Sequence, residues 1–194
     1  MIKKPGSRGL IFVVSGPSGS GKTTLRDELL KDKELRKRLV KSISFTTRPK
    51  RSGELNKKEY FFITKDEFKR KLQAKKILEW TRYLGYYYAT PKDFVEKQLK
   101  KAKHIILCLD LKGALTIKSF FPKNTVTIFI IPPSFKALQD RIERRCHKTK
   151  REEIGERLKI ARKELQASRK YDYCLVNKNL AQAVKGLKGI ILRE

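Results

Sequence analysis

The sequence predicts an α/β fold of three layers, with helices on both sides of a mostly parallel central sheet. Four short apolar runs, at residues 10–14, 105–109, 126–131 and 173–176, have the length and composition of buried parallel strands. Amphipathic helical patterns separate these runs. Strands that alternate with helices join into one sheet through right-handed crossovers, and this arrangement gives the fold class.

The helical patterns follow the predicted strands in order. The first begins after the first strand and its loop, and its leucines continue as far as Leu39. The second opens at Thr90 and Pro91, with threonine as the N-cap and proline in the first helical position. The third starts after a Ser134 cap, and the fourth carries an apolar stripe over 154–165. Each helix is expected to bury one face against the core.

Residues 42–90 interrupt this alternation. Aromatic and β-branched segments lie within the stretch, at 42–45, 60–64, 77–80 and 83–89. A helix that carries Phe68, Leu72 and Leu78 is expected among them. We interpret the stretch as a small mixed α+β insert mounted on the α/β core.

Length and composition indicate a single soluble domain. A chain of 194 residues with 39% hydrophobic content can bury a full core. No stretch approaches the ~18 apolar residues of a membrane-spanning helix, and the apolar run after the basic N-terminus is too short for a signal peptide. The cysteines Cys108, Cys146 and Cys174 are scattered, which is typical of inert thiols in a reducing cytoplasm. We therefore expect a cytoplasmic protein without a membrane partner.

The net charge of the chain is +28, from 48 Lys and Arg against 20 Asp and Glu. So basic a balance favours anionic partners such as nucleotides, nucleic acids or membrane surfaces. The basic residues are spread, however, over the polar faces of the predicted helices. We interpret the charge as a solubility property and expect no dedicated nucleic-acid partner. The chain is expected to be a monomer or a homodimer.

A phosphate-binding loop follows the first predicted strand and leads into the first helix. It has the pattern G-x-x-x-x-G-K-[ST], and its members are Gly16, Pro17, Ser18, Gly19, Ser20, Gly21, Lys22 and Thr23. The glycines let backbone N–H groups turn toward a polyphosphate, and the helix N-terminus adds its positive end. Lys22 is expected to reach the β- and γ-phosphates, and the Thr23 hydroxyl is expected to bind Mg²⁺. The sequence therefore predicts a nucleotide-binding protein.

A second anion site is expected in the insert. Arg48 and Arg51 stand three residues apart beside a turn. Guanidinium groups bind phosphate bidentately, so two of them suit a compact dianion. Tyr60 and Tyr88 can donate O–H bonds to the same phosphate. The insert is thus predicted to hold the group that receives a phosphoryl group.

Several separate motifs occur along the chain in one order: GPSGSGKTTL, SISFTTRPKRSGE, LEWTRYLGYYYAT, LDLKGA, IFIIPPS and YDYCLVN. In this order and at these spacings the chain resembles guanylate kinases over nearly its whole length. The resemblance implies one domain, with a P-loop core at about 1–41, 91–137 and 158–194, a GMP-binding insert at about 42–90 and a helical lid at about 138–157. It implies phosphoryl transfer from ATP to GMP with Mg²⁺, giving ADP and GDP in purine nucleotide metabolism.

The resemblance also assigns roles to single residues. The GMP phosphate would be held by Arg48, Arg51, Tyr60 and Tyr88. The guanine would be read by Ser44, Glu79, Thr90 and Asp110. Catalysis would involve Lys22, Arg48, Arg145 and Arg157. The last two arginines would close over the phosphates with the lid, where comparable arginines contribute ~10³–10⁵ in rate.

Guanine chemistry independently supports a carboxylate at Glu79. Guanine presents N1–H and N2–H₂ donors on one edge, and one carboxylate accepts both. Adenine places a bare N1 acceptor there and would face Glu79 lone pair to lone pair. A site that leaves buried polar groups unpaired rejects the wrong ligand by ~10⁴-fold or more.

The chain departs from the guanylate kinase pattern near its second predicted strand, at 105–109. The family usually has Asp-x-Asp-x-Gln-Gly there, whereas this chain has Cys108, Asp110 and Lys112 at the matching positions. A neutral thiol is no ligand for a hard cation. Mg²⁺ would then depend on Thr23, ATP oxygens and water, or Asp110 would serve two roles. Lys112 is expected to add positive charge near the phosphates.

Three further departures lie in the insert and the lid. Ala89 replaces a glycine after Tyr88. Lys57 replaces a glycine in the turn before Tyr60, and this change disfavours a positive φ there. The lid segment 146–151 is one residue longer and more basic than the family pattern.

Three alternatives to a guanylate kinase stay open. One is a related P-loop kinase with another phosphorylated acceptor, for which Glu79→Ala would scarcely matter. Another is a guanylate-kinase-like binding module without catalysis, although such modules typically lose residues that this chain keeps, namely Lys22, Arg48 and Arg51. The third is a nucleic-acid binder, which predicts steeply salt-dependent binding.

Overall fold

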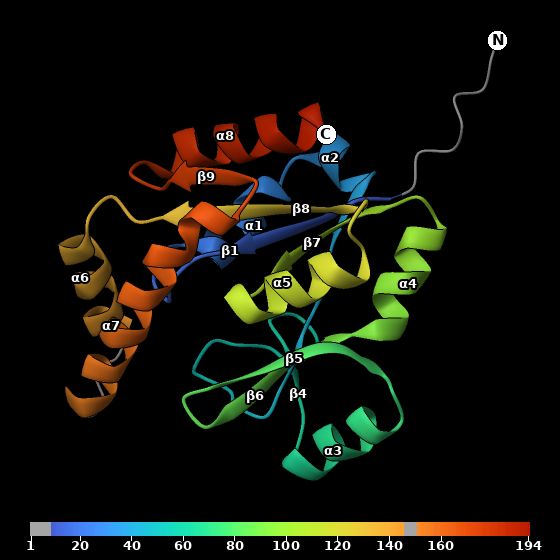
Figure 1. The fold of residues 1–194 in the computed structure, drawn as a ribbon, viewed down its shortest axis with the longest axis horizontal. Coiled ribbons are helices and arrows are strands. Elements are labelled where there is room, and N and C mark those ends of the chain that lie inside the picture. The colour runs from blue at the N-terminus through green and yellow to red at the C-terminus, as the bar shows by residue number, and fades with distance from the viewer. Residues whose placement is uncertain (1–8, 146–150) are drawn as a thin grey trace.

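The computed structural model describes residues 9–145 and 151–194, except for the side chains of Arg145 and Arg151 (Figure 1). Its core is a parallel sheet with the strand order β2-β7-β1-β8-β9. The strands are β1 (Ile11–Ser15), β2 (Leu39–Lys41), β7 (His104–Cys108), β8 (Thr125–Ile131) and β9 (Tyr173–Val176). Every pairing in this sheet is parallel, and β1 is fully buried between β7 and β8. The predicted α/β class is confirmed.

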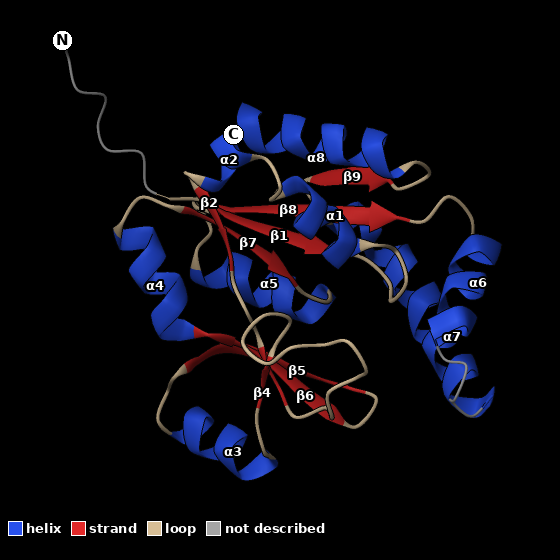
Figure 2. Ribbon diagram, turned by 180° about the vertical axis from the view of Figure 1, so that it is seen from behind, coloured by secondary structure: helices blue, strands red, loops and turns tan. Residues whose placement is uncertain are grey.

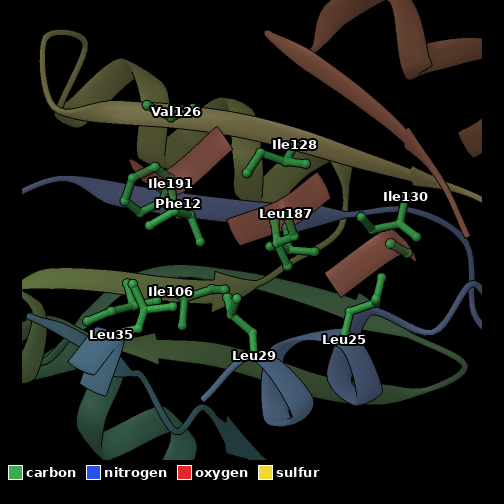
Figure 3. Close-up of a cluster of buried hydrophobic side chains, with 13 residues drawn as sticks. Phe12, Leu25, Leu29, Leu35, Ile106, Val126, Ile128, Ile130, Leu187 and Ile191 are labelled. Carbon is green, nitrogen blue, oxygen red and sulfur yellow. The ribbon is translucent and has the colours of Figure 1, made fainter. Parts of the chain in front are cut away.

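Helices cover both faces of this sheet and make three layers. One face carries α1 (Lys22–Leu29), α2 (Lys33–Arg36) and α8 (Leu180–Arg193), and the other carries α4 (Lys92–Lys100) and α5 (Leu111–Phe120). Side chains alternate along β1, so Phe12 and Val14 enter the first core, whereas Ile11 and Val13 enter the second. Figure 3 shows Phe12 packed with side chains of α1 and α8. This rigid core fixes the loops at the carboxyl ends of its strands.

The insert is a mixed four-stranded sheet with the order β4-β3-β6-β5. Its elements are β3 (Phe45–Thr46), β4 (Phe61–Phe62), α3 (Lys65–Gln73), β5 (Ile77–Tyr83) and β6 (Tyr86–Pro91). A capping box between Thr64 and Glu67 starts α3. Phe68 of this helix stacks on Tyr87 with ring centroids 4.5 Å apart, so the insert has a small core of its own. Figure 2 shows it as a separate body below α5.

The predicted lid at about 138–157 falls on α6 (Phe135–Arg145) and α7 (Arg151–Gln166), which continues into the 3₁₀ turn η1 (Ala167–Lys170). Leu138 and Ile142 of α6 pack on Ala161 of α7, so the two helices lie side by side (Figure 1). Ser134 caps α6 by accepting a hydrogen bond from the Ala137 N–H at 3.1 Å, as the sequence predicted. None of the described helices is long and apolar enough to cross a bilayer.

Some element assignments from the sequence were wrong. Leu39 begins β2 rather than extending the first helix, because α1 ends at Leu29 and the short α2 intervenes. Leu78 belongs to β5 and not to the helix of the insert. Thr90 lies in β6, and Pro91 takes the cap position of α4 without a side-chain hydrogen bond.

The turn at Lys57 was also predicted wrongly. Its φ is 66°, the left-handed value that a lysine was expected to avoid. The Lys57 N–H donates to the Tyr60 carbonyl at 2.9 Å, and this bond closes the turn. The turn geometry therefore overrides the steric preference of the residue.

Candidate active site

The phosphate-binding loop has the geometry that its glycines predict. Gly16, Gly19 and Gly21 all have positive φ, at 137°, 88° and 96°. A Cβ on Gly16 would lie 2.5 Å from the Ile130 carbonyl oxygen, so only glycine fits there. Lys22 bends back over the loop, and its Nζ donates to the carbonyls of Gly16 at 2.5 Å and of Pro17 at 3.0 Å. The ammonium group therefore stands over the hollow where a phosphate would bind.

Asn177 braces this loop from the far side. Its Nδ2 donates to the Ser20 carbonyl at 2.8 Å, and both residues are buried. A Cβ on Gly21 would lie 2.4 Å from the same Nδ2. Sequence reasoning quoted Asn177 in a motif but gave it no role. Its position directly after β9, at the carboxyl edge of the sheet, was the available signal.

One cavity of about 340 Å³ runs from the phosphate-binding loop to the insert. Of the residues predicted from the sequence, it is lined by Gly16, Ser18, Gly19, Gly21, Lys22, Thr23, Ser44, Arg48, Arg51, Tyr60, Glu79, Tyr88, Asp110 and Arg157. Pro17, Ser20 and Thr90 are buried and are not among the lining residues. The side chain of Arg145 falls outside the described part of the structure. The cavity thus joins both predicted anion sites.

The insert presents Arg48 to the cavity in a fixed orientation. The side chain is buried, its Nη2 donates to Glu54 Oε1 at 2.8 Å, and its Nη1 donates to the Pro49 carbonyl at 2.6 Å. The guanidinium lies 5.6 Å from the ring centroid of Tyr60, and the ion pair with Glu54 raises the Arg48 pKa against its burial. Arg51 is exposed at the rim, and its N–H donates to the other Glu54 oxygen at 2.8 Å. Glu54, which was not predicted, therefore accepts hydrogen bonds from both Arg48 and Arg51 and holds the turn between them.

Glu79 is a buried carboxyl group at the other end of the cavity. The Thr90 hydroxyl donates to its Oε1 at 2.5 Å, so Thr90 reaches the cavity only through Glu79. Burial raises the Glu79 pKa to about 7, and the nearby Asp110 adds to the rise. Asp110 caps α5 by accepting the Gly113 N–H at 2.8 Å. A Cβ on Gly113 would lie 2.8 Å from Glu79 Oε2, so the helix start packs directly on this carboxyl group.

Arg157 enters the cavity from α7. Its guanidinium is buried and donates from Nη2 to Glu153 Oε1 at 2.6 Å, one helical turn earlier. Burial raises the pKa of the half-buried Tyr83, and the charge of Arg157 opposes part of this rise. Of the two arginines predicted for the lid, Arg157 thus lines the cavity.

The residues around Thr23 fit a Mg²⁺ site built mainly from substrate oxygens. Thr23 and Asp110 both line the cavity and offer oxygen ligands. Among residues 9–145 and 151–194, no group of three His, Cys, Asp or Glu side chains is placed to hold a metal ion. Burial raises the pKa of the Cys108 thiol, which keeps it neutral and unsuited to a hard cation.

The positions of three charged residues in or beside the cavity were not predicted from the sequence. Lys112 does not line the cavity; its ammonium lies 5.1 Å from the Trp80 ring centroid, on the side of Glu79. Arg26 and Glu164 do line it, although the sequence singled out neither. Burial raises the Glu164 pKa to about 7 beside the charge of Lys22. Arg26 follows Lys22 by four residues, and this helical spacing could have predicted that Arg26 lines the cavity.

Comparisons with known proteins agree with this geometry. The sequence model of the guanylate kinase family matches residues 8–194. The chain is 43% identical over 193 residues to the guanylate kinase of Caldanaerobacter subterraneus, covering all of this chain and 90% of that protein. It is 41% identical to that of Bacillus subtilis, covering 96% and 90%. The crystal structure of the guanylate kinase from Anaplasma phagocytophilum superposes with a TM-score of 0.80 at 30% identity, covering 96% and 86%. The chain belongs to the guanylate kinase family.

Proposed function

We propose that the protein transfers the γ-phosphoryl group of ATP to the phosphate of GMP, using the residues that line this cavity. The single observation that carries the proposal is the continuity of the cavity. It joins Lys22 and Thr23 of the phosphate-binding loop to Arg48 and Tyr60, and then to Glu79. One end suits a nucleoside triphosphate, the middle suits a second phosphate, and the far end suits a base with two donors on one edge.

The proposed roles follow from the chemistry of each end. Lys22 and the loop amides bind the β- and γ-phosphates of ATP. Arg48, Arg51 and the two tyrosines hold the GMP phosphate in line with the γ-phosphorus. An oxygen of the GMP phosphate then attacks that phosphorus, and the bond to the β–γ bridging oxygen breaks to release ADP. No protein nucleophile takes part, so the protein contributes position and charge.

Mg²⁺, when bound by the Thr23 hydroxyl and phosphate oxygens, would offset the phosphate charge. Arg157, and Arg145 as the resemblance implies, would add positive charge around the transferring group. Lid closure would exclude water, which otherwise accepts the phosphoryl group from ATP.

The guanine end would select the base. Glu79 would accept N1–H and N2–H₂, and Ser44 and Asp110 would contribute further polar contacts. The hydrogen bond from the Thr90 hydroxyl to Oε1 would fix the rotamer of Glu79. The second oxygen, Oε2, would then point away from Thr90. The substrates are thus small molecules. We propose a cytoplasmic monomer or homodimer that has no nucleic-acid partner.

A coupled ADP-release assay tests the function. ATP and Mg²⁺ are supplied with GMP, AMP, CMP or UMP in turn, and we expect turnover with GMP alone. Glu79→Ala should abolish GMP preference, whereas Glu34→Ala, at an exposed acid of α2, should match the wild type. Turnover with another monophosphate, or an unchanged Glu79→Ala enzyme, would favour a kinase with a different acceptor. A gel shift at near-physiological salt tests the nucleic-acid alternative.

A further inference from the structure

Arg26 lies at the junction of the two substrate sites. It follows Lys22 by four residues in α1, so both side chains project from the same face of the helix. The Arg26 side chain is only 9% exposed, and it lines the cavity together with Lys22, Cys108 and Tyr60. A buried guanidinium in this place needs an anionic partner or an anionic ligand.

Asp27 clamps one edge of this guanidinium. Nε of Arg26 donates to Asp27 Oδ1 at 2.9 Å, and Nη2 lies 2.8 Å from Oδ1 and 3.1 Å from Oδ2. The Asp27 side chain is 51% exposed at the mouth of the cavity, where Lys41 approaches it at 3.8 Å. The ion pair with Asp27 therefore holds the Nε–Nη2 edge of the guanidinium toward the mouth of the cavity. Nη1 lies on the opposite side, toward Cys108.

The Nη1 side of Arg26 faces a weak acceptor. Its contact there is Cys108 Sγ at 3.9 Å, and burial raises the pKa of this thiol, so the thiol is neutral. A sulfhydryl sulfur is a poor hydrogen-bond acceptor. Among the residues that the structure describes, the ion pair of Arg26 lies on the side of Asp27, so its inner N–H groups suit an anionic oxygen.

Arg26 and Arg48 approach the acceptor site from opposite bodies. Arg48 belongs to the insert and Arg26 to the P-loop core. The charges of both lower the pKa of the buried Tyr60 hydroxyl, although burial still raises it on balance. The Arg48 guanidinium lies 5.6 Å from the Tyr60 ring centroid, and Arg26 lines the same cavity as Tyr60. A phosphate beside Tyr60 would have one arginine toward the insert and the other toward the P-loop.

We propose that Arg26 is a further catalytic residue, whose inner Nη1 edge binds the phosphate oxygens between GMP and the γ-phosphoryl group, and that Asp27 is the positioning residue that orients it. The proposal rests on the proposed function. Arg26 gives up no proton: the new bond joins a GMP phosphate oxygen to the γ-phosphorus, and the bond to the ADP oxygen breaks. The fixed positive charge offsets the negative charge that gathers as the two phosphates approach.

The test compares Arg26→Met and Arg26→Lys with Arg36→Met, a matched change at an exposed arginine of α2. Turnover with GMP is measured together with the equilibrium binding of GMP and of guanosine, which lacks the phosphate. Arg26→Met should lower kcat/KM for GMP by about 10²-fold, as loss of a charge-stabilising donor does. Binding of guanosine should stay within about twofold of the wild type. Arg26→Lys keeps the positive charge but lacks the planar guanidinium group, so its kcat/KM should lie between those of Arg26→Met and the wild type.

Asp27→Asn tests the positioning role. The variant should lower kcat by about tenfold and leave the binding of guanosine unchanged. In the double variant with Arg26→Met the second change should cost nothing further, because Asp27 acts only through Arg26. Independent, additive losses would overturn that role.

Equal losses of GMP and guanosine binding in Arg26→Met, or full turnover in that variant, would overturn the proposal. If Arg26→Met fails to fold by thermal melting, Arg26→Lys and Asp27→Asn carry the same comparison. Failure of the proposed function looks different, since the wild type would then show no turnover with GMP.

Discussion

Replacement of Glu79 by glutamine removes a titrating group from the core. The side chain is 5% exposed, and burial raises its pKa to about 7 against a usual value of 4.5. At about 1.4 kcal/mol per pKa unit, this difference corresponds to about 3 kcal/mol between the two protonation states. The free protein therefore holds Glu79 protonated at pH values where the unfolded chain has lost the proton.

The direction of the pH effect follows from this difference. Between about pH 4.5 and 7 the folded state binds more protons than the unfolded state, so the free energy of unfolding falls as the pH rises. The loss through Glu79 is complete above about pH 7. In Glu79→Gln this loss of about 3 kcal/mol is missing, because glutamine has no proton to give up. The variant should therefore gain stability relative to the wild type as the pH rises.

Urea unfolding of both proteins at pH 5 and pH 8 measures the effect. Glu164, whose pKa is also about 7, is present in both proteins, so its contribution cancels in the comparison. If the free energy of unfolding falls equally in the wild type and in Glu79→Gln between pH 5 and pH 8, Glu79 does not titrate in this window. That result would refute the reasoning from burial.

In the proposed function, the same carboxyl group would link pH to the recognition of guanine. Guanine donates two N–H bonds, which only the ionised form of Glu79 accepts in full. Guanosine is the suitable ligand, because it carries no phosphate that titrates near neutral pH. Its Kd should rise about tenfold from pH 8 to pH 6 in the wild type, since the pKa lies near 7. In Glu79→Gln the Kd should be high and independent of pH.

Three further changes test single contacts. Gly113→Ala forces a Cβ against the Glu79 carboxyl group, which is proposed to bind guanine, and should raise KM for GMP about tenfold, whereas Gly189→Ala, whose Cβ meets open space, should leave it unchanged in the same assay. Lys57→Gly relieves a positive φ and should stabilise the protein by about 0.5–1 kcal/mol in urea unfolding; a destabilised variant would contradict this. Cys108→Asp places a carboxylate beside Arg26, so KM for GMP should rise with no change in the Mg²⁺ midpoint; a lower midpoint would show that the new acid binds the metal.

Local patterns were sufficient to predict the fold class, the insert and the phosphate-binding loop. The loop depends on residues that are consecutive in the chain, so its geometry follows from the sequence alone. Leu39 was misassigned because the spacing from Leu35 fits a helix as well as it fits a turn followed by an edge strand. The placement of Lys112 over Trp80 was missed because it depends on how α5 docks against the insert, which no local pattern describes.

Three arginines that line the cavity, one of which the sequence did not predict, share one structural feature. An arginine that faces a cavity is partly stripped of water even before a substrate binds, and a carboxylate partner offsets part of the cost of burying its charge. Arg26 pairs with Asp27 at 2.8 Å, and Arg48 pairs with Glu54 at 2.8 Å. Arg157 pairs with Glu153, one helical turn earlier, at 2.6 Å.

Each of these carboxylates is more exposed than its arginine and stands within six residues of it in the sequence. A nearby partner holds one part of the guanidinium in place. The rest of the fork is then oriented without help from the substrate, so less entropy is lost when a phosphate binds. A search for site arginines in such a chain should therefore look for a carboxylate close by in sequence as well as for the arginine itself. Arg26 next to Asp27, one helical turn after the P-loop lysine, meets that criterion.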